Sequence, residues 1–165
     1  MNLASAAEGT NLDADDGPNN IIVRRYTEIG IVKGYGKITV EAREGVILDA
    51  RHISYFVRLS AESSDDYPRH GHSAITLDAL PKFIEAIDRL RTASIDQKKF
   101  KFTEIEYNYE NIKVVVFNNL SGKIMISIQI GDVSVNFSDV NALLEIKELI
   151  NRAINHIEMH RIDGS

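Results

Sequence analysis

One short polar segment holds most of the residue types that catalysis or metal binding usually needs. It reads Asp65-Asp-Tyr-Pro-Arg-His-Gly-His72, and its candidate side chains are Asp65, Asp66, His70 and His72. Two imidazoles and a carboxylate could bind a metal, but zinc needs three or four converging ligands, and the glycine between the histidines leaves them poorly preorganised. The pattern therefore favours a solvated hairpin loop. A loop of this length can also contact a ligand or a partner.

Two other patterns resemble cofactor motifs but lack a necessary part. His156 and His160 lie four residues apart on an expected helix, without the glutamate that directly follows the first histidine of a zincin. Gly34-Tyr-Gly36 joins two expected strands, whereas a phosphate-binding loop joins a strand to a helix. No nucleophile elbow, kinase motif or dinucleotide fingerprint occurs. We therefore expect no enzymatic activity, no metal site and no cofactor.

The composition excludes several classes of protein. The chain has 165 residues, a net charge of −5 and no cysteine, which rules out disulfides, thiolate nucleophiles and cysteine-ligated metals. No apolar run approaches the roughly 18 residues of a membrane span, and the first residues lack the pattern of a secretory signal. These features predict a soluble, cytoplasmic protein without membrane contact.

Charge is distributed unevenly along the chain. Residues 1–20 contain four acidic and no basic side chains, whereas residues 21–92 contain 11 basic and 10 acidic ones. Nucleic-acid binders usually show a basic stripe, because neutralising phosphates supplies most of the non-specific affinity. No such stripe is visible in the sequence, so the acidic balance disfavours nucleic acid. A fold could still gather Arg24-Arg25 and Lys98–Lys101 on one face.

Hydrophobic periodicity predicts a β-rich first half that ends in a helix. Glycine-containing turns are expected at Gly34-Tyr-Gly36 and Glu44-Gly45. Asp78 is expected to cap the helix, and Pro81 falls in its first turn, where a missing amide costs nothing. The predicted elements are a disordered acidic tail over 1–20, strands over 21–32, 37–43, 46–53, 55–61 and 73–77, and a helix over 78–92.

The second half repeats this organisation after a linker over 93–99. Its predicted elements are strands over 100–109, 112–117, 123–130 and 132–137, a helix capped by Ser138 that runs to about Glu158, and a C-terminal tail over 159–165. The fold class is therefore α+β, with two tandem antiparallel β-meander-plus-helix units at 21–92 and 100–158. Each unit has about four strands and one helix packed on a sheet face, and the first has one extra N-terminal strand.

Two alignments of the halves compete. Tyr26-Thr-Glu-Ile29 matches Phe102-Thr-Glu-Ile105 most closely by letters. Matching Ile38–Ala42 with the same segment instead gives four strands and a helix on each side. We favour the second alignment, because it keeps the strand count equal and leaves residues 21–32 as an added strand.

The duplicated meander-plus-helix layout resembles, in outline and over most of residues 37–158, that of the Whirly and Pur-alpha single-stranded nucleic-acid binders. The resemblance implies nucleic-acid binding as an alternative function. In that alternative, residues that alternate onto polar sheet faces would contact phosphates, and aromatic residues on the strands would stack on bases. The candidates are Arg43, Arg58, Lys113 and Lys123 for phosphates, and Phe56 or Phe117 for stacking.

Two apolar surfaces favour assembly instead. Val114-Val-Val-Phe117 does not alternate with polar residues, and the last helix has a wide apolar arc. A strand that is apolar on both faces is usually covered on both, either by the sister repeat or by a second subunit. Our first expectation is therefore a non-catalytic binding or assembly module that forms a homodimer or binds a protein partner.

Overall fold

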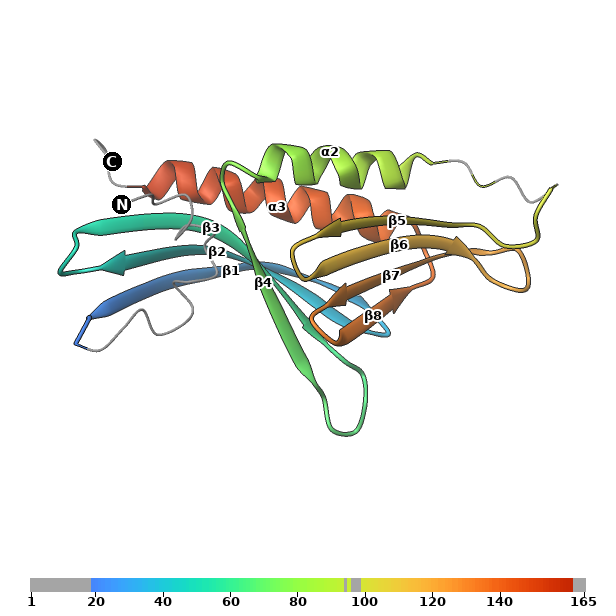
Figure 1. The fold of residues 1–165 in the computed structure, drawn as a ribbon, viewed down its shortest axis with the longest axis horizontal. Coiled ribbons are helices and arrows are strands. Elements are labelled where there is room, and N and C mark those ends of the chain that lie inside the picture. Colours follow the sequence, from blue (N-terminus) through green and yellow to red (C-terminus); the bar gives the residue numbers. More distant parts are fainter. Residues whose placement is uncertain (1–18, 94, 96–98, 162–165) are drawn as a thin grey trace.

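The computed structural model describes residues 19–93, 95 and 99–161 (Figure 1). They form an α+β fold of two four-stranded antiparallel sheets and two helices. Sheet A has the strand order β1-β2-β3-β4, and sheet B has the order β5-β6-β7-β8. The tail predicted over 1–20 lies almost entirely outside the described residues, as do four residues of the predicted linker and the last four of the chain.

Each sheet is a meander followed directly by a helix. The elements of the first half are β1 (Ile22–Gly34), β2 (Gly36–Ile47), β3 (His52–Glu62), β4 (His70–Thr76) and α2 (Leu80–Arg91). Those of the second half are β5 (Glu104–Tyr109), β6 (Ile112–Asn118), β7 (Ile124–Ile130), β8 (Val133–Phe137) and α3 (Asn141–His160). None of the described helices is long and apolar enough to cross a membrane.

The first half has four strands within the described residues. The strand predicted over 21–32 is β1, one of these four, so the prediction of an extra N-terminal strand is wrong. The predicted turn at Glu44-Gly45 does not form, because Gly45 lies inside β2 and pairs with Arg24 in β1 and Ser54 in β3. The chain turns instead at residues 48–51. A glycine beside a charged residue resembles a turn locally, but pairing with two neighbouring strands keeps this one extended.

The same correction reverses the preferred alignment of the halves. With four strands in each sheet, β1 and β5 are the equivalent first strands. Tyr26–Ile29 lies in β1, and Phe102–Ile105 leads into β5. The alignment by letters therefore follows the topology, and the alternative that we favoured on strand count does not.

Both helices begin later than predicted: α2 begins at Leu80, two residues after the predicted cap Asp78, and α3 at Asn141, three residues after Ser138. Ala79 is the residue that precedes α2, and no side chain caps this helix. Thr76–Ala79 forms a turn in which the Ala79 amide donates to the Thr76 carbonyl at 3.0 Å. Asp78 therefore does not cap this helix, although Pro81 lies in its first turn as predicted. Before α3, it is Asp139 rather than Ser138 that accepts a hydrogen bond from a backbone amide, that of Asn141, at 2.9 Å.

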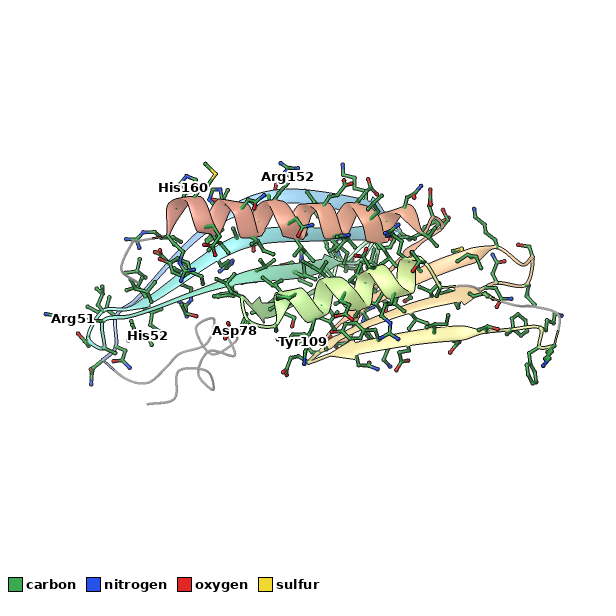
Figure 2. All side chains as sticks on the ribbon, turned by 90° about the horizontal axis from the view of Figure 1, so that it is seen from above. Arg51, His52, Asp78, Tyr109, Arg152 and His160 are labelled. Carbon is green, nitrogen blue, oxygen red and sulfur yellow. The ribbon has the colours of Figure 1, made fainter. Side chains whose placement is uncertain are left out.

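The two helices lie side by side on one side of the sheets (Figures 1 and 2). The long helix α3, which follows sheet B in the chain, contacts β1, β2 and β3 of sheet A. The helix α2, which follows sheet A, contacts α3 and β5 of sheet B. The Phe83 ring meets the rings of Tyr107 and Tyr109 edge-on, with centroids 5.8 and 5.9 Å apart. One continuous apolar core therefore includes residues of both sheets and both helices.

Among the described residues, one isolated backbone bridge joins the two sheets. The Tyr35 amide, at the tip of the β1–β2 hairpin, donates to the Asn136 carbonyl of β8 at 2.8 Å. A Cβ atom at Gly34 would meet the Phe137 ring, and one at Gly36 would meet the Glu62 carbonyl oxygen. These glycines therefore allow a tight turn and a close approach between sheets, which agrees with their prediction as hairpin residues.

Candidate binding surface on sheet A

The side of sheet A turned away from the helices is called here the outer face of sheet A. It arises from simple alternation in β2, where Ile38, Val40 and Ala42 are buried toward the helices. The intervening residues point to the outer face, and strand pairing aligns them with residues of β1 and β3. The aligned pairs on this face include Thr39 with Ser60, Glu41 with Arg58, and Arg43 with Tyr26 and Phe56.

Arg43 lies at the centre of this face. Its guanidinium donates to the Glu41 carboxylate from Nε at 3.3 Å and from an NH2 group at 3.2 Å. The guanidinium carbon also lies 4.3 Å from the centroid of the Tyr26 ring. Arg43 is 9% exposed, whereas Tyr26 is 62% exposed. The arginine is therefore held in place while the aromatic ring remains accessible.

Glu41 orients a second arginine as well. The Arg58 Nε lies 3.8 Å from the same carboxylate oxygen that binds Arg43. One acidic residue thus holds two guanidinium groups close together on adjacent strands. A groove of about 280 Å³ lies over these side chains and extends toward Lys37 and His70.

The outer face of sheet A is locally basic although the whole chain carries a net charge of −5. By strand register, it contains five basic side chains, Arg24, Lys33, Lys37, Arg43 and Arg58, and three acidic ones, Glu28, Glu41 and Glu62. Three histidines, His52, His70 and His72, share the same face. Such a surface attracts anions, and its two central arginines are suited to phosphate.

The predicted phosphate and base contacts are divided between the two sheets. Arg43 and Arg58 lie together on sheet A, whereas Lys113 lies on β6 of sheet B, 3.9 Å from the Glu106 carboxylate. Lys123 precedes β7, and Phe117 is half-buried on β6. These residues therefore do not form one surface.

Phe56 belongs to the outer face of sheet A but is only 2% exposed. It packs with Ile47 and Ala74, and Ile22 lies against this small cluster, which is separate from the main core. No base can stack on a ring buried in this way. Tyr26, which sequence reasoning missed, is the accessible aromatic residue at this position; its alternation with Arg24 and Glu28 in β1 was the available signal.

The four candidate residues of the predicted loop do not lie together: two belong to a strand and two to a loop. His70 and His72 lie in β4, which begins three residues earlier than predicted, because they pair with Glu62 and Ser60. Asp65 and Asp66 remain in the loop between β3 and β4. Across the described residues, no group of three or more His, Asp or Glu side chains could hold a metal ion.

A second cavity, of about 230 Å³, lies on the helix side of sheet A near the C-terminal end of α3, where Figure 2 labels His160. The His156 and His160 rings stack here with centroids 4.4 Å apart. Arg25 and Glu44 also line the cavity, and they form an ion pair at 2.6 Å. Glu44 neutralises Arg25 here, whereas the groove on the outer face has three basic side chains, Lys37, Arg43 and Arg58, against Glu41 and Glu62.

The outer face of sheet B differs in character. Val115 and Phe117 of β6 and Met125 of β7 form a short, half-buried apolar row on the side away from the helices. Glu104 and Glu106 border this row on β5. Lys113 and Lys123 share this face, so it is apolar at its centre and has balanced charges around it.

Comparisons with known proteins add no family to this description. No protein-family model matches the sequence, and a search of curated proteins finds no similar one.

Proposed function

We propose that this protein is a non-catalytic binding module that binds single-stranded nucleic acid on the outer face of sheet A. The observation that carries this proposal is the contact between Arg43 and Tyr26. It places an exposed aromatic ring 4.3 Å from a guanidinium group, on a locally basic sheet face.

Each side chain in this arrangement has a chemical role in binding a single strand. Tyr26 offers its ring to a base, and base–aromatic stacking is worth about 1–3 kcal/mol per base. Arg58 and Lys37 flank the groove and supply positive charge for phosphates. Glu41 positions Arg43 and Arg58 without contacting the ligand. About three phosphate contacts would give a salt slope near −2, since single strands release about 0.7 counterion per contact.

A labelled oligothymidine tests this proposal by fluorescence anisotropy at about 50 mM salt, where phosphate contacts are strong. We expect Tyr26→Ala to weaken binding by roughly fivefold or more, as expected for the loss of one stacked base. Lys82→Ala is the matched control, because Lys82 is exposed on α2, on the other side of the sheets. Absence of binding by the unmodified protein would remove the proposal.

A second candidate function, assembly into a homodimer, is favoured by the outer face of sheet B. Within the described part of the chain no helix lies over Val115, Phe117 and Met125, so a second copy could bury this row. Light scattering at high micromolar concentration tests the dimer. We expect Phe117→Glu to give a monomer and Tyr26→Glu, on sheet A, to leave the mass unchanged. A monomeric unmodified protein would contradict this function.

A further inference from the structure

We propose that the acidic N-terminal segment, residues 1–18, binds the outer face of sheet A and competes there with nucleic acid. The inference rests on the proposed function of this face and concerns its regulation. It commits to one occupant, a segment of the same chain that precedes the described residues.

Charge complementarity is the first argument. The segment contains Glu8, Asp13, Asp15 and Asp16 and no lysine, arginine or histidine. Its expected target has five basic against three acidic side chains by strand register. The outer face of sheet B offers no such excess, because Glu104 and Glu106 share it with Lys113 and Lys123. Among the two outer faces, that of sheet A is therefore the electrostatically favoured one.

The attachment point of the segment is the second argument. Leu48 donates its amide to the Ile21 carbonyl at 3.1 Å, which fixes the chain at the β2–β3 turn just before β1. Since β1 is an edge strand of sheet A, the segment is attached at the rim of this sheet, next to its outer face as well as to the face covered by the helices.

The reach of the segment matches the positions of the arginines. An extended chain spans about 3.4 Å per residue, so Asp13 can lie up to about 27 Å from Ile21. Arg43 pairs with Tyr26, which lies five residues along β1 and one strand spacing of about 4.8 Å away. Arg43 is thus about 18 Å from Ile21. Arg58 pairs with Glu41, which lies opposite Glu28, so it is about 26 Å from Ile21. Asp13 can therefore reach both arginines, and Asp15, with a span of about 20 Å, can reach Arg43.

Covalent attachment makes even a weak contact effective. A short flexible connection gives an effective concentration in the millimolar range. A segment with an intrinsic dissociation constant near 0.1 mM would then reduce the apparent affinity for a competing strand by roughly tenfold. This reduction depends on salt, because both competitors bind through charge.

Paired charge variants test the competition. We expect D13N/D15N to tighten oligothymidine binding by about three- to tenfold at about 50 mM salt, and we expect the gain to shrink at about 0.5 M. The matched control is E145Q/E148Q, which changes net charge equally on the exposed side of α3. If the control gives an equal gain, net charge accounts for the effect and the inference is overturned.

A second readout separates this inference from the proposed function. Backbone amide shifts of Arg43 and Arg58 are recorded by NMR without any nucleic acid, in the unmodified full chain and in D13N/D15N. Shift changes confined to the outer face of sheet A support the contact between the segment and this face even if no oligonucleotide binds, in which case the proposed function fails and the contact stands. Unchanged shifts together with unchanged oligonucleotide affinity overturn the inference and leave the proposed function standing.

Discussion

Two glycines at turns, Gly36 and Gly131, differ in how much space a side chain would have at their positions. Gly36 has φ of +106°, and a Cβ atom there would meet the Glu62 carbonyl oxygen. Gly131 has φ of +63°, but no atom lies within 4 Å of the place a Cβ would occupy. Both positions disfavour L side chains by their backbone conformation, and Gly36 adds a steric clash with backbone atoms.

We expect Gly36→Ala to lower the free energy of unfolding by more than about 2 kcal/mol, and Gly131→Ala by about 1 kcal/mol. Urea denaturation of the two variants measures the difference. Equal losses would mean that the β1–β2 hairpin tip adjusts to the added methyl group and that the approach to β3 is not tight.

Tyr107 provides a prediction about alkaline pH. Burial raises the pKa of the Tyr107 hydroxyl above its ordinary value of 10.0, because the charged form loses hydration beside Phe83. A raised pKa stabilises the fold fully below the unfolded value, and this contribution is lost as pH rises through the folded value. Tyr107→Phe should therefore be less sensitive to pH between about 9 and 12 than the unmodified protein. Thermal unfolding across that range measures this, and equal sensitivity would contradict it.

At the scale of elements, α3 has more than one neighbour. It buries Leu143, Ile146 and Ile150, and it contacts both sheet A and α2. This explains why its apolar arc is wider than one sheet contact requires. The arc is covered within the chain, so it no longer supports a dimer; the apolar row on sheet B still does.

An ion pair also ties the two helices together. Lys147 of α3 donates to Asp88 of α2 at 2.7 Å, and Arg91 donates to the same carboxylate at 3.2 Å. The hydrogen bond from Lys147 is the main reason that the pKa of Asp88 lies below its ordinary value of 3.8. The carboxylate is thus held in its charged form between the helices.

We expect Lys147→Met to raise the pKa of Asp88 toward its ordinary value, as measured by NMR titration of the carboxyl carbon. A lowered folded pKa stabilises the protein above the unfolded value, and this stability is lost as pH falls through the folded value. The difference in stability between the two proteins should therefore be present at pH 7 and disappear at strongly acidic pH. A difference that does not change with pH would show that the aliphatic part of Lys147 matters rather than its charge.

In the whole molecule, each helix has contacts with the other half of the chain: α3 lies on sheet A, and α2 contacts β5 of sheet B. The helix-facing residues of sheet A, such as Ile38, Val40 and Val57, are fully buried, and it is α3 from the second half that contacts β1, β2 and β3. Each such side chain loses about 1.5–3 kcal/mol of stabilisation if it becomes exposed. Neither half therefore has a complete cover for its own sheet.

We expect the fragment 19–93 to remain unfolded or aggregate when expressed alone, and to fold when co-expressed with the fragment 99–161. Circular dichroism and dispersed NMR amide signals distinguish these outcomes. Cooperative unfolding of the isolated fragment 19–93 would instead show that α2 can cover sheet A by itself.

Local periodicity in the sequence was sufficient to predict the α+β class, most of the strands and both helices. The alternation from Lys37 to Arg43 and from Lys123 to Ile130 correctly identified the buried face of each strand. Such patterns are readable because strands and helices repeat every 2 and 3.6 residues, whatever lies elsewhere in the chain. Local signals failed at Gly45, where a residue typical of turns lies inside a strand.

The candidate binding surface was decided by the tertiary structure. Tyr26 and Arg43 are 17 positions apart in the sequence, and only the β1–β2 register places the guanidinium against the ring. The five basic residues of the outer face come from three strands, and only three acidic residues share that face with them. Strand register and the packing of each helix against the other half depend on contacts between distant residues, which leave no periodic trace in the sequence. That is why composition indicated an acidic protein, and folding produced one basic face.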